Sequence, residues 1–178
     1  MQALRGIVGG ARMVGLGESV HTSGGFHQAH ERMVKFMVKE MGFRVLALET
    51  PRVRALPVTN YVATCQGDPT EALRSIYGVF ASTNMRNLVT WMCQWNTEHP
   101  KDPVRFVGFD MKEPWFDHLA LEAFLREASP ADAEALIEGL STCDAIKAIS
   151  QADYNENYAH LVGGRLEAGN FGQAGLVT

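Results

Sequence analysis

Short apolar segments that lead directly into acidic residues dominate the pattern of hydrophobic and polar positions along the chain. Three such segments are rich in β-branched or aromatic residues and are bounded by Gly or Pro, which is typical of buried strands. They cover residues 12–17 before Glu18, residues 43–48 before Glu49, and residues 104–109 before Asp110. We therefore predict three strands, and the amino terminus is expected to run straight into the first of them.

A helix is predicted over residues 26–41, between the first two strands. Its apolar positions recur at helical spacing and would form one buried stripe, and Gly42 is placed to cap its carboxyl end. The stripe consists of Phe26, His30, Met33, Met37 and Met41. Strand, helix and strand in this order make a βαβ unit, which implies parallel pairing and a right-handed crossover.

The rest of the patterned chain favours helices. They are predicted over residues 55–65, 70–77, 85–98, 116–128, 131–140 and 143–149, and the apolar face of the helix over 85–98 carries Leu88, Trp91, Met92 and Trp95. From residue 163 the sequence is rich in glycine and shows no periodicity. No further strand is evident after Asp110.

This order of elements predicts an α/β fold, in which a parallel sheet with a βαβ core is flanked by helices and followed by an all-helical segment. We divide the chain into an α/β catalytic core over residues 1–113, a helical segment over 114–162, and a glycine-rich tail over 163–178 with the composition of a disordered segment. Parallel sheets have both faces covered and usually contain more than three strands. We therefore expect a partial version of a larger fold, with room for a second chain to complete the sheet.

Composition narrows the classes of partner. The chain has 178 residues, of which 46% are hydrophobic and 20% charged, and its net charge is −4. This balance gives no reason to expect a nucleic acid or an anionic membrane as partner, and no apolar run is long enough to span a bilayer. The three cysteines, Cys65, Cys93 and Cys143, are odd in number and widely spaced, so we expect free thiols and a cytoplasmic location.

The candidate chemistry lies at the ends of the predicted strands. Glu18, Glu49 and Asp110 each follow a strand, and ligands of open α/β sheets bind outside the carboxyl ends of parallel strands. His21 would join them from the loop after the first strand. A neutral His21 held by a carboxylate can take a proton from water as a general base. We therefore predict a site of carboxylates around one histidine.

Structural roles compete with this interpretation. A lone carboxylate at a strand end often caps the next helix, and Asp110 fits that role as well as a functional one. Glu18 and His21 share a tight glycine-rich turn, which packing explains poorly. His27 and His30 lie in the first turns of the helix, where they either line the site or form hydrogen bonds in the core. A structural or solvated role is expected for His99, His118 and His160.

Several familiar motifs are absent. Residues 15–20 lack the third glycine of a dinucleotide fingerprint. Residues 17–21 begin like a nucleophile elbow but end in histidine, so Ser19 is a poor nucleophile. His21, Glu18, Glu49 and a second histidine could ligate a metal, but their spacing matches no recognised signature. We expect no cofactor and no resident metal, and we keep a metal-dependent hydrolase as an alternative.

An ordered set of short motifs resembles the erythromycin esterase family over about residues 7–113. The motifs are residues 15–21, Phe26, residues 42–49, Asn60 with Tyr61 and Val62, Trp91 with Asn96, and residues 104–110. The resemblance implies hydrolysis of an ester or lactone. Macrolides are one class of such substrates, and their hydrolysis would imply antibiotic resistance. It implies His21 as the base that activates water and Glu18 and Glu49 as supporting carboxylates. Phe26, His27, His30 and Asp110 are then expected to bind the substrate.

Two departures from the family pattern suggest a second alternative. The family usually has a glutamate before the phenylalanine and an arginine four residues after it, where this chain has Gly25 and His30. Complete members also continue into a second half that contributes to the cleft, and nothing after Asp110 resembles it. The alternative is a truncated or degenerate member without catalysis.

Overall fold

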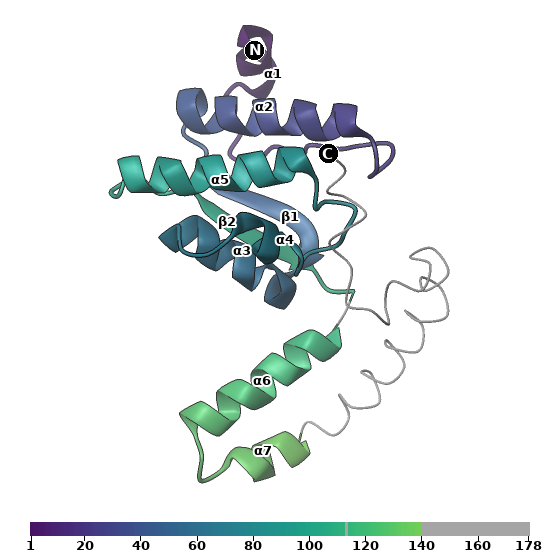
Figure 1. The fold of residues 1–178 in the computed structure, drawn as a ribbon, viewed down its shortest axis with the longest axis vertical. Coiled ribbons are helices and arrows are strands. Elements are labelled where there is room, and N and C mark those ends of the chain that lie inside the picture. The colour runs from purple at the N-terminus through teal and green to yellow at the C-terminus, as the bar shows by residue number, and fades with distance from the viewer. Residues whose placement is uncertain (113, 140–178) are drawn as a thin grey trace.

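The computed structural model of the protein describes residues 1–112 and 114–139 and arranges helices around a small parallel sheet (Figure 1). The strands are β1 (Val45–Pro51) and β2 (Arg105–Asp110). The helices are α1 (Gln2–Val8), α2 (Gly24–Met41), α3 (Arg52–Thr64), α4 (Pro69–Leu73), α5 (Thr83–Glu98), α6 (Pro114–Ala128) and α7 (Ala133–Gly139). The predicted α/β class with a parallel sheet is confirmed.

The two strands pair in parallel, as predicted for the second and third apolar segments. Val45 pairs with Arg105 and Leu48 with Gly108, and the register becomes irregular near Pro51. At this irregularity the backbone approaches so closely that a Cβ on Gly108 would lie 2.4 Å from the carbonyl oxygen of Thr50. Only glycine fits between the strand and its neighbour at this point.

The strand predicted over residues 12–17 is absent from the described structure. Val14 and Leu16 pack against the core, while Met13 and Gly15 are exposed. Burial therefore alternates along this segment as it would in a strand, but a strand also needs hydrogen bonds to a neighbouring strand. The predicted βαβ unit around α2 does not form, and the unpredicted helix α1 precedes the extended segment instead.

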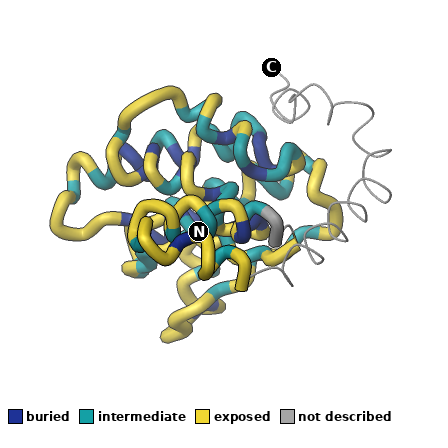
Figure 2. The backbone as a smooth tube through the Cα atoms, turned by 90° about the horizontal axis from the view of Figure 1, so that it is seen from below, coloured by how far each residue is buried: buried dark blue, intermediate teal, exposed yellow. Residues whose placement is uncertain are grey.

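The core lies where α2, α3 and α5 meet β2. α3 contacts both strands and α5, and α2 packs on α5, so that α5 lies between α2 and α3 in Figure 1. Figure 2 shows short buried stretches that alternate with exposed ones along the chain. The buried residues of the cluster include Val34, Met37, Val38, Val58, Val62, Leu88, Val89, Met92, Val104 and Phe106.

The buried stripe of α2 is rotated relative to the prediction. Val34, Met37 and Val38 are its buried residues, whereas Phe26 and His30 are only half-buried. The first turns of α2 lie beside the segment that precedes the helix rather than over the core, so helical spacing alone placed the stripe too far toward Phe26. Gly42 ends the helix in the left-handed conformation, with φ of 75°, as predicted.

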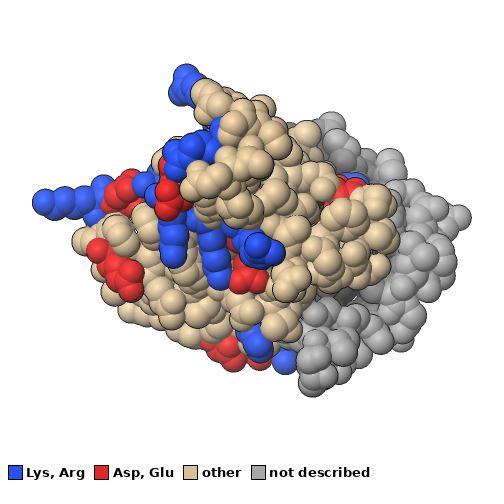
Figure 3. All heavy atoms as spheres, turned by 90° about the horizontal axis from the view of Figure 1, so that it is seen from above, with Lys and Arg blue, Asp and Glu red and all other residues tan. Residues whose placement is uncertain are grey.

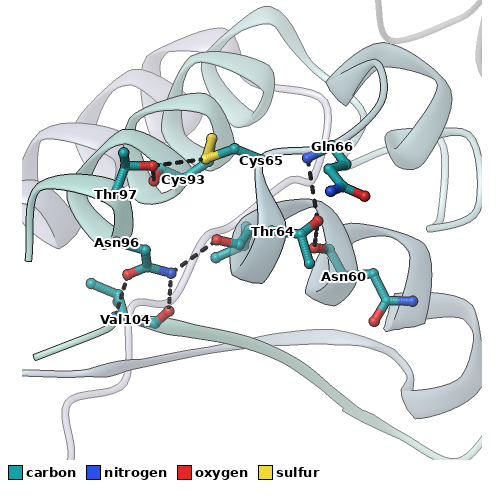
Figure 4. The surroundings of a disulfide bond; sticks show 9 residues. Asn60, Thr64, Cys65, Gln66, Cys93, Asn96, Thr97 and Val104 are labelled. Carbon is teal, nitrogen blue, oxygen red and sulfur yellow. Dashed lines mark hydrogen bonds between the residues drawn. A yellow bond between two sulfur atoms is a disulfide. The ribbon is translucent and has the colours of Figure 1, made fainter. Parts of the chain in front are cut away.

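Asn96 connects three elements of the core by its side chain (Figure 4). Its amide nitrogen donates to the carbonyl oxygens of Val62 in α3 and Val104, both at 2.9 Å. Its amide oxygen accepts from the backbone nitrogen of Val104 at 2.7 Å. One side chain of α5 thereby satisfies main-chain groups of α3 and of the residue that leads into β2.

A disulfide links Cys65 to Cys93, so the expectation of free thiols is wrong for this pair. Cys65 follows the last residue of α3 and Cys93 lies in α5, with their Cα atoms 5.3 Å apart (Figure 4). The pairing depends on how α3 and α5 pack, and spacing along the chain does not reveal it. A cytoplasmic location therefore no longer follows from the cysteines. Cys143 lies outside the described residues.

Helices α6 and α7 correspond to the helices predicted over residues 116–128 and 131–140, and they pack on each other. Residue 140 itself lies outside the described residues. The helix predicted over residues 143–149, His160 and the tail over 163–178 lie outside the described residues. The division of the chain at residues 113 and 162 stays a prediction. Among the described helices, none is long and apolar enough to cross a membrane.

Candidate active site

The Gly17–His21 loop places a carboxylate against an imidazole. Oε1 of Glu18 lies 2.5 Å from Nδ1 of His21. A carboxylate accepts hydrogen bonds and has no hydrogen to donate, so Nδ1 of His21 carries the proton. In the neutral imidazole the lone pair then resides on Nε2. The side chain of Glu18 is 11% exposed and that of His21 is 49% exposed, so solvent reaches the imidazole while the carboxylate is largely shielded.

An aromatic side chain limits the orientation of this imidazole. The rings of His21 and Phe80 meet edge to face, with centroids 5.2 Å apart, and Phe80 is itself buried. Edge-to-face packing is a favoured geometry of ring pairs. Phe80 therefore supports the ring of His21 while Glu18 fixes its tautomer.

His27 and His30, which were predicted to bind substrate, contact the same loop. Nε2 of His27 lies 2.7 Å from the carbonyl oxygen of His21 and 4.0 Å from Oε2 of Glu18. Nε2 of His30 lies 3.3 Å from the carbonyl oxygen of Gly17. Both histidines therefore have protein partners. Phe26 is half-buried in the first turn of α2, next to His27, and substrate binding by these residues stays a prediction.

Asp110 is connected to His21 through the turn that contains Tyr77 and Phe80. The hydroxyl of Tyr77 donates to Oδ2 of Asp110 at 3.3 Å, and the backbone nitrogen of Met111 donates to Oδ1 at 2.8 Å. Tyr77 and Phe80 belong to one turn, in which the nitrogen of Phe80 donates to the carbonyl of Tyr77 at 2.9 Å. The turn thus contacts the His21 ring at one end and Asp110 at the other.

Glu49 stands apart from the Glu18–His21 pair. Its exposed carboxylate lies 3.7 Å from Nζ of Lys112, and no contact joins it to Glu18 or His21 in the part of the chain that the structure describes. The same residues contain no group of three or more His, Cys, Asp or Glu side chains that could hold a metal ion. The metal-dependent alternative therefore has no ligand set there.

Glu31 ties α2 to the start of α5, close to this turn. Its carboxylate accepts from Nδ2 of Asn84 at 2.8 Å and from Nζ of Lys35 at 2.6 Å. Burial opposes its ionisation, but the hydrogen bonds from Asn84 and Lys35 and the charge of Lys35 outweigh burial, so the pKa of Glu31 is lowered from its ordinary value.

Ser82 caps α5 by accepting from the nitrogen of Met85 at 3.1 Å.

Tyr77, Phe80 and Asn84 were not identified from the sequence. Ser82 is a favoured N-cap residue and could have placed the start of α5 at Thr83 rather than at Met85. No signal in the sequence links Phe80 to His21, because the two residues are brought together by the packing of α2 on α5.

The remaining histidines have structural surroundings in the described residues. His99 stacks on Trp95, with ring centroids 3.8 Å apart. His118 is buried beside Glu122 in α6, so of the two roles expected for it the structural role fits and the solvated one does not. The apolar stripe of α6 is weak, so the sequence did not indicate which face of this helix is buried.

The face of the molecule above α1 and α2 carries mixed charge (Figure 3). Basic and acidic side chains lie next to one another, as in the pair of Arg5 with Glu40 at 3.1 Å and of Lys35 with Glu31 at 2.6 Å. Such alternation does not produce an extended field of one sign. The absence of a nucleic acid partner stays a prediction.

A family model described as erythromycin esterase matches residues 38–170. The chain is 30% identical over 142 residues to YbfO of Bacillus subtilis strain 168, which is named as a hydrolase, covering 76% of this chain and 30% of that protein. It is 25% identical over 108 residues to erythromycin esterase type II of Escherichia coli, covering 61% of this chain and 25% of that protein. The chain thus spans between a quarter and a third of the length of these relatives.

Two solved structures resemble the fold. A crystal structure of a Bacillus cereus protein has a TM-score of 0.64 at 30% identity and covers 77% of this chain and 33% of that one. A crystal structure of a succinoglycan biosynthesis protein has a TM-score of 0.68 at 22% identity and covers 97% of this chain and 47% of that one. The range matched by the family model begins after His21, so the significance of the Glu18–His21 pair rests on its geometry.

Proposed function

The chain belongs to the erythromycin esterase family, and on that basis we propose that it is a hydrolase that cleaves an ester or lactone with a water molecule activated by His21 and Glu18. The observation that carries this proposal is the 2.5 Å contact between Oε1 of Glu18 and Nδ1 of His21. It leaves Nε2 of a half-exposed imidazole as the only ring nitrogen able to accept a proton.

The reaction follows from this tautomer. Nε2 of His21 removes a proton from water as the oxygen attacks the carbonyl carbon of the substrate, which produces a tetrahedral intermediate and an imidazolium. Glu18 stabilises the imidazolium through Nδ1–H, as the acidic member of a catalytic triad does. The intermediate then collapses, the bond to the alcohol oxygen breaks, and His21 returns its proton to that oxygen. General base catalysis of this kind contributes about 10²–10⁴-fold to the rate.

The other predicted residues receive supporting roles. Asp110, held by Tyr77, is the last residue of β2, and Glu49, beside Lys112, lies two residues before the end of β1. Ligands of parallel sheets bind outside the carboxyl ends of the strands. We assign Glu49 as a supporting carboxylate and Asp110 as a substrate-binding residue. A macrolide lactone is one substrate of suitable chemistry, since an E. coli relative is an erythromycin esterase, and its cleavage would confer antibiotic resistance.

A second candidate is a member that binds a ligand without turnover. The chain spans only 30% of YbfO and 25% of the E. coli esterase. In addition, one face of the sheet is open: Val45 is 46% exposed and Phe109 is 62% exposed. Parallel sheets are usually covered on both faces. A second polypeptide chain that completes the sheet is the partner that we propose for an active assembly.

Hydrolysis of a macrolide and a panel of simple esters by the purified chain, followed by mass spectrometry, tests the proposal. Addition of one water molecule is expected with the wild-type chain and is expected to disappear with His21→Ala. Ser19→Ala serves as the matched control, because it changes a neighbouring loop residue outside the pair. Hydrolysis by His21→Ala at the wild-type rate would rule out His21 as the base, and a folded wild-type chain without turnover would favour the ligand-binding candidate.

A further inference from the structure

The segment that carries Glu18 and His21 has little main-chain support of its own. Residues 12–22 contain no helix or strand in the described structure, and a Cβ on Gly15 or Gly17 would meet nothing within 4 Å. The main-chain hydrogen bond that closes a turn there runs from the nitrogen of Ser23 to the carbonyl oxygen of Val20 at 3.4 Å. A glycine-containing segment of this kind does not hold two side chains in a fixed arrangement unless other contacts restrain it.

Two side chains of α2 supply such contacts. His27 and His30 are three positions apart and so lie on one face of the helix. Their Nε2 atoms reach the carbonyl oxygens of His21 at 2.7 Å and of Gly17 at 3.3 Å. These two carbonyls stand at the two ends of the Gly17–His21 loop, with Glu18 between them. Because a carbonyl oxygen only accepts, Nε2 is the donor in both histidines.

The contacts are well placed to restrain the loop. The side chain of His27 is only 11% exposed, which shields its hydrogen bond from competition by water. The same nitrogen lies 4.0 Å from Oε2 of Glu18, so its N–H dipole also favours the position of the carboxylate. The bonds end on carbonyl oxygens, whereas capping of the amino end of α2 would need acceptors for its free N–H groups. Helix capping therefore does not explain them.

The helix that carries both histidines is itself firmly anchored. Val34, Met37 and Val38 are buried in the core, and Glu31 joins α2 to Asn84 of α5 at 2.8 Å. Restraint therefore extends from the core through α2 to the loop. Phe80, which precedes α5, contacts the ring of His21 edge to face.

From this geometry we infer that His27 and His30 are positioning residues, which hold the loop by its carbonyl oxygens and thereby keep Glu18 against Nδ1 of His21. The inference rests on the proposed function, since it concerns the residues that hold the proposed base. It gives both histidines a role that requires no contact with substrate.

The tautomer of His21 reports this role without any substrate. A neutral imidazole free in water carries its proton mostly on Nε2, whereas contact with Glu18 requires the proton on Nδ1. The full chain labelled with ¹⁵N is examined by long-range ¹H–¹⁵N correlation at about pH 8.5, where a histidine of ordinary pKa, about 6.5, is neutral. The signals of His21 are identified by their loss in a His21→Gln variant.

Two substitutions of His27 form a matched pair. In His27→Gln the amide nitrogen reaches about as far as Nε2 of the imidazole and can still donate to the carbonyl of His21. In His27→Asn the amide nitrogen is equally polar but too short to reach that carbonyl. The same pair at position 30 tests the longer contact. Circular dichroism and thermal unfolding establish that each variant is folded.

The expected result is a wild-type His21 with its proton on Nδ1, the same state in His27→Gln, and a return to mostly Nε2–H in His27→Asn. His30→Asn should have the smaller effect, because its contact is 3.3 Å rather than 2.7 Å. An unchanged His21 tautomer in folded His27→Asn would overturn the inference and leave the proposed function intact. A wild-type His21 with its proton on Nε2 would overturn both, because the Glu18 contact itself would be missing.

Discussion

Removal of the Cys65–Cys93 disulfide should lower the free energy of unfolding by about 3.6 kcal/mol. The two cysteines are 28 positions apart. In the chain-entropy description, a cross-link over about 28 residues removes about 12 cal/mol/K of conformational entropy from the unfolded state, which corresponds to about 3.6 kcal/mol at 25 °C. Small domains have total stabilities of about 5–15 kcal/mol. The loss would therefore be a large fraction of the stability of this chain.

The double variant Cys65→Ser/Cys93→Ala tests this prediction by urea unfolding. Alanine is chosen at position 93 because that side chain is buried beside α3. With a urea slope of about 1–3 kcal/mol/M, the midpoint should fall by more than about 1 M. Cys143→Ser is the matched control, and it should leave the midpoint unchanged in the oxidised protein.

Thiol titration of the unfolded, unreduced chain provides an independent check. The sequence contains three cysteines, so the disulfide predicts one reactive thiol per chain, which Cys143→Ser removes. Three reactive thiols in air-oxidised protein, or a double variant as stable as the wild type, would refute the reasoning.

Three further predictions concern the core and the surroundings of the site. Gly108→Ala should destabilise the fold by about 1–3 kcal/mol or more, because the new Cβ would lie 2.4 Å from the carbonyl oxygen of Thr50; Gly139→Ala, where nothing lies within 4 Å, is the control in thermal unfolding. Asn96→Ala should cost at least about 2 kcal/mol in urea unfolding, because it leaves buried main-chain groups without partners. The pKa of Glu31 is lowered in the folded state. The contribution of ionised Glu31 to stability is therefore present above its unfolded pKa and is lost as pH falls through its folded pKa. Glu31→Gln should flatten the acid side of the curve of unfolding free energy against pH, and an unchanged curve would contradict the assignment.

The sequence identified the paired strands but not the number of strands. Residues 43–48 and 104–109 are nearly continuous apolar runs, and they lie in β1 and at the start of β2. Residues 12–17 also form a short apolar run, but its alternate residues Met13, Gly15 and Gly17 are exposed. Periodicity reports burial on one side, and it cannot report whether a neighbouring backbone is within hydrogen-bonding reach.

The candidate site was identified in part for a similar reason. Glu18 and His21 are three positions apart in a tight loop, so their proximity is local and could be inferred from the sequence. The contacts of His27 and His30 depend on how the loop folds back over α2, and the contact of Phe80 with His21 depends on how α5 packs on α2. Such contacts join distant segments, and a single sequence carries no record of them.

The central claim is that Glu18 and His21 catalyse hydrolysis as one unit. The most direct test compares turnover numbers on one cleavable ester for Glu18→Gln, His21→Ala and the double variant. Residues that act together have strongly non-additive effects. We therefore predict that each single variant loses most of the rate and that the double variant loses no more than His21→Ala alone. Additive losses, or full activity of His21→Ala, would contradict the account.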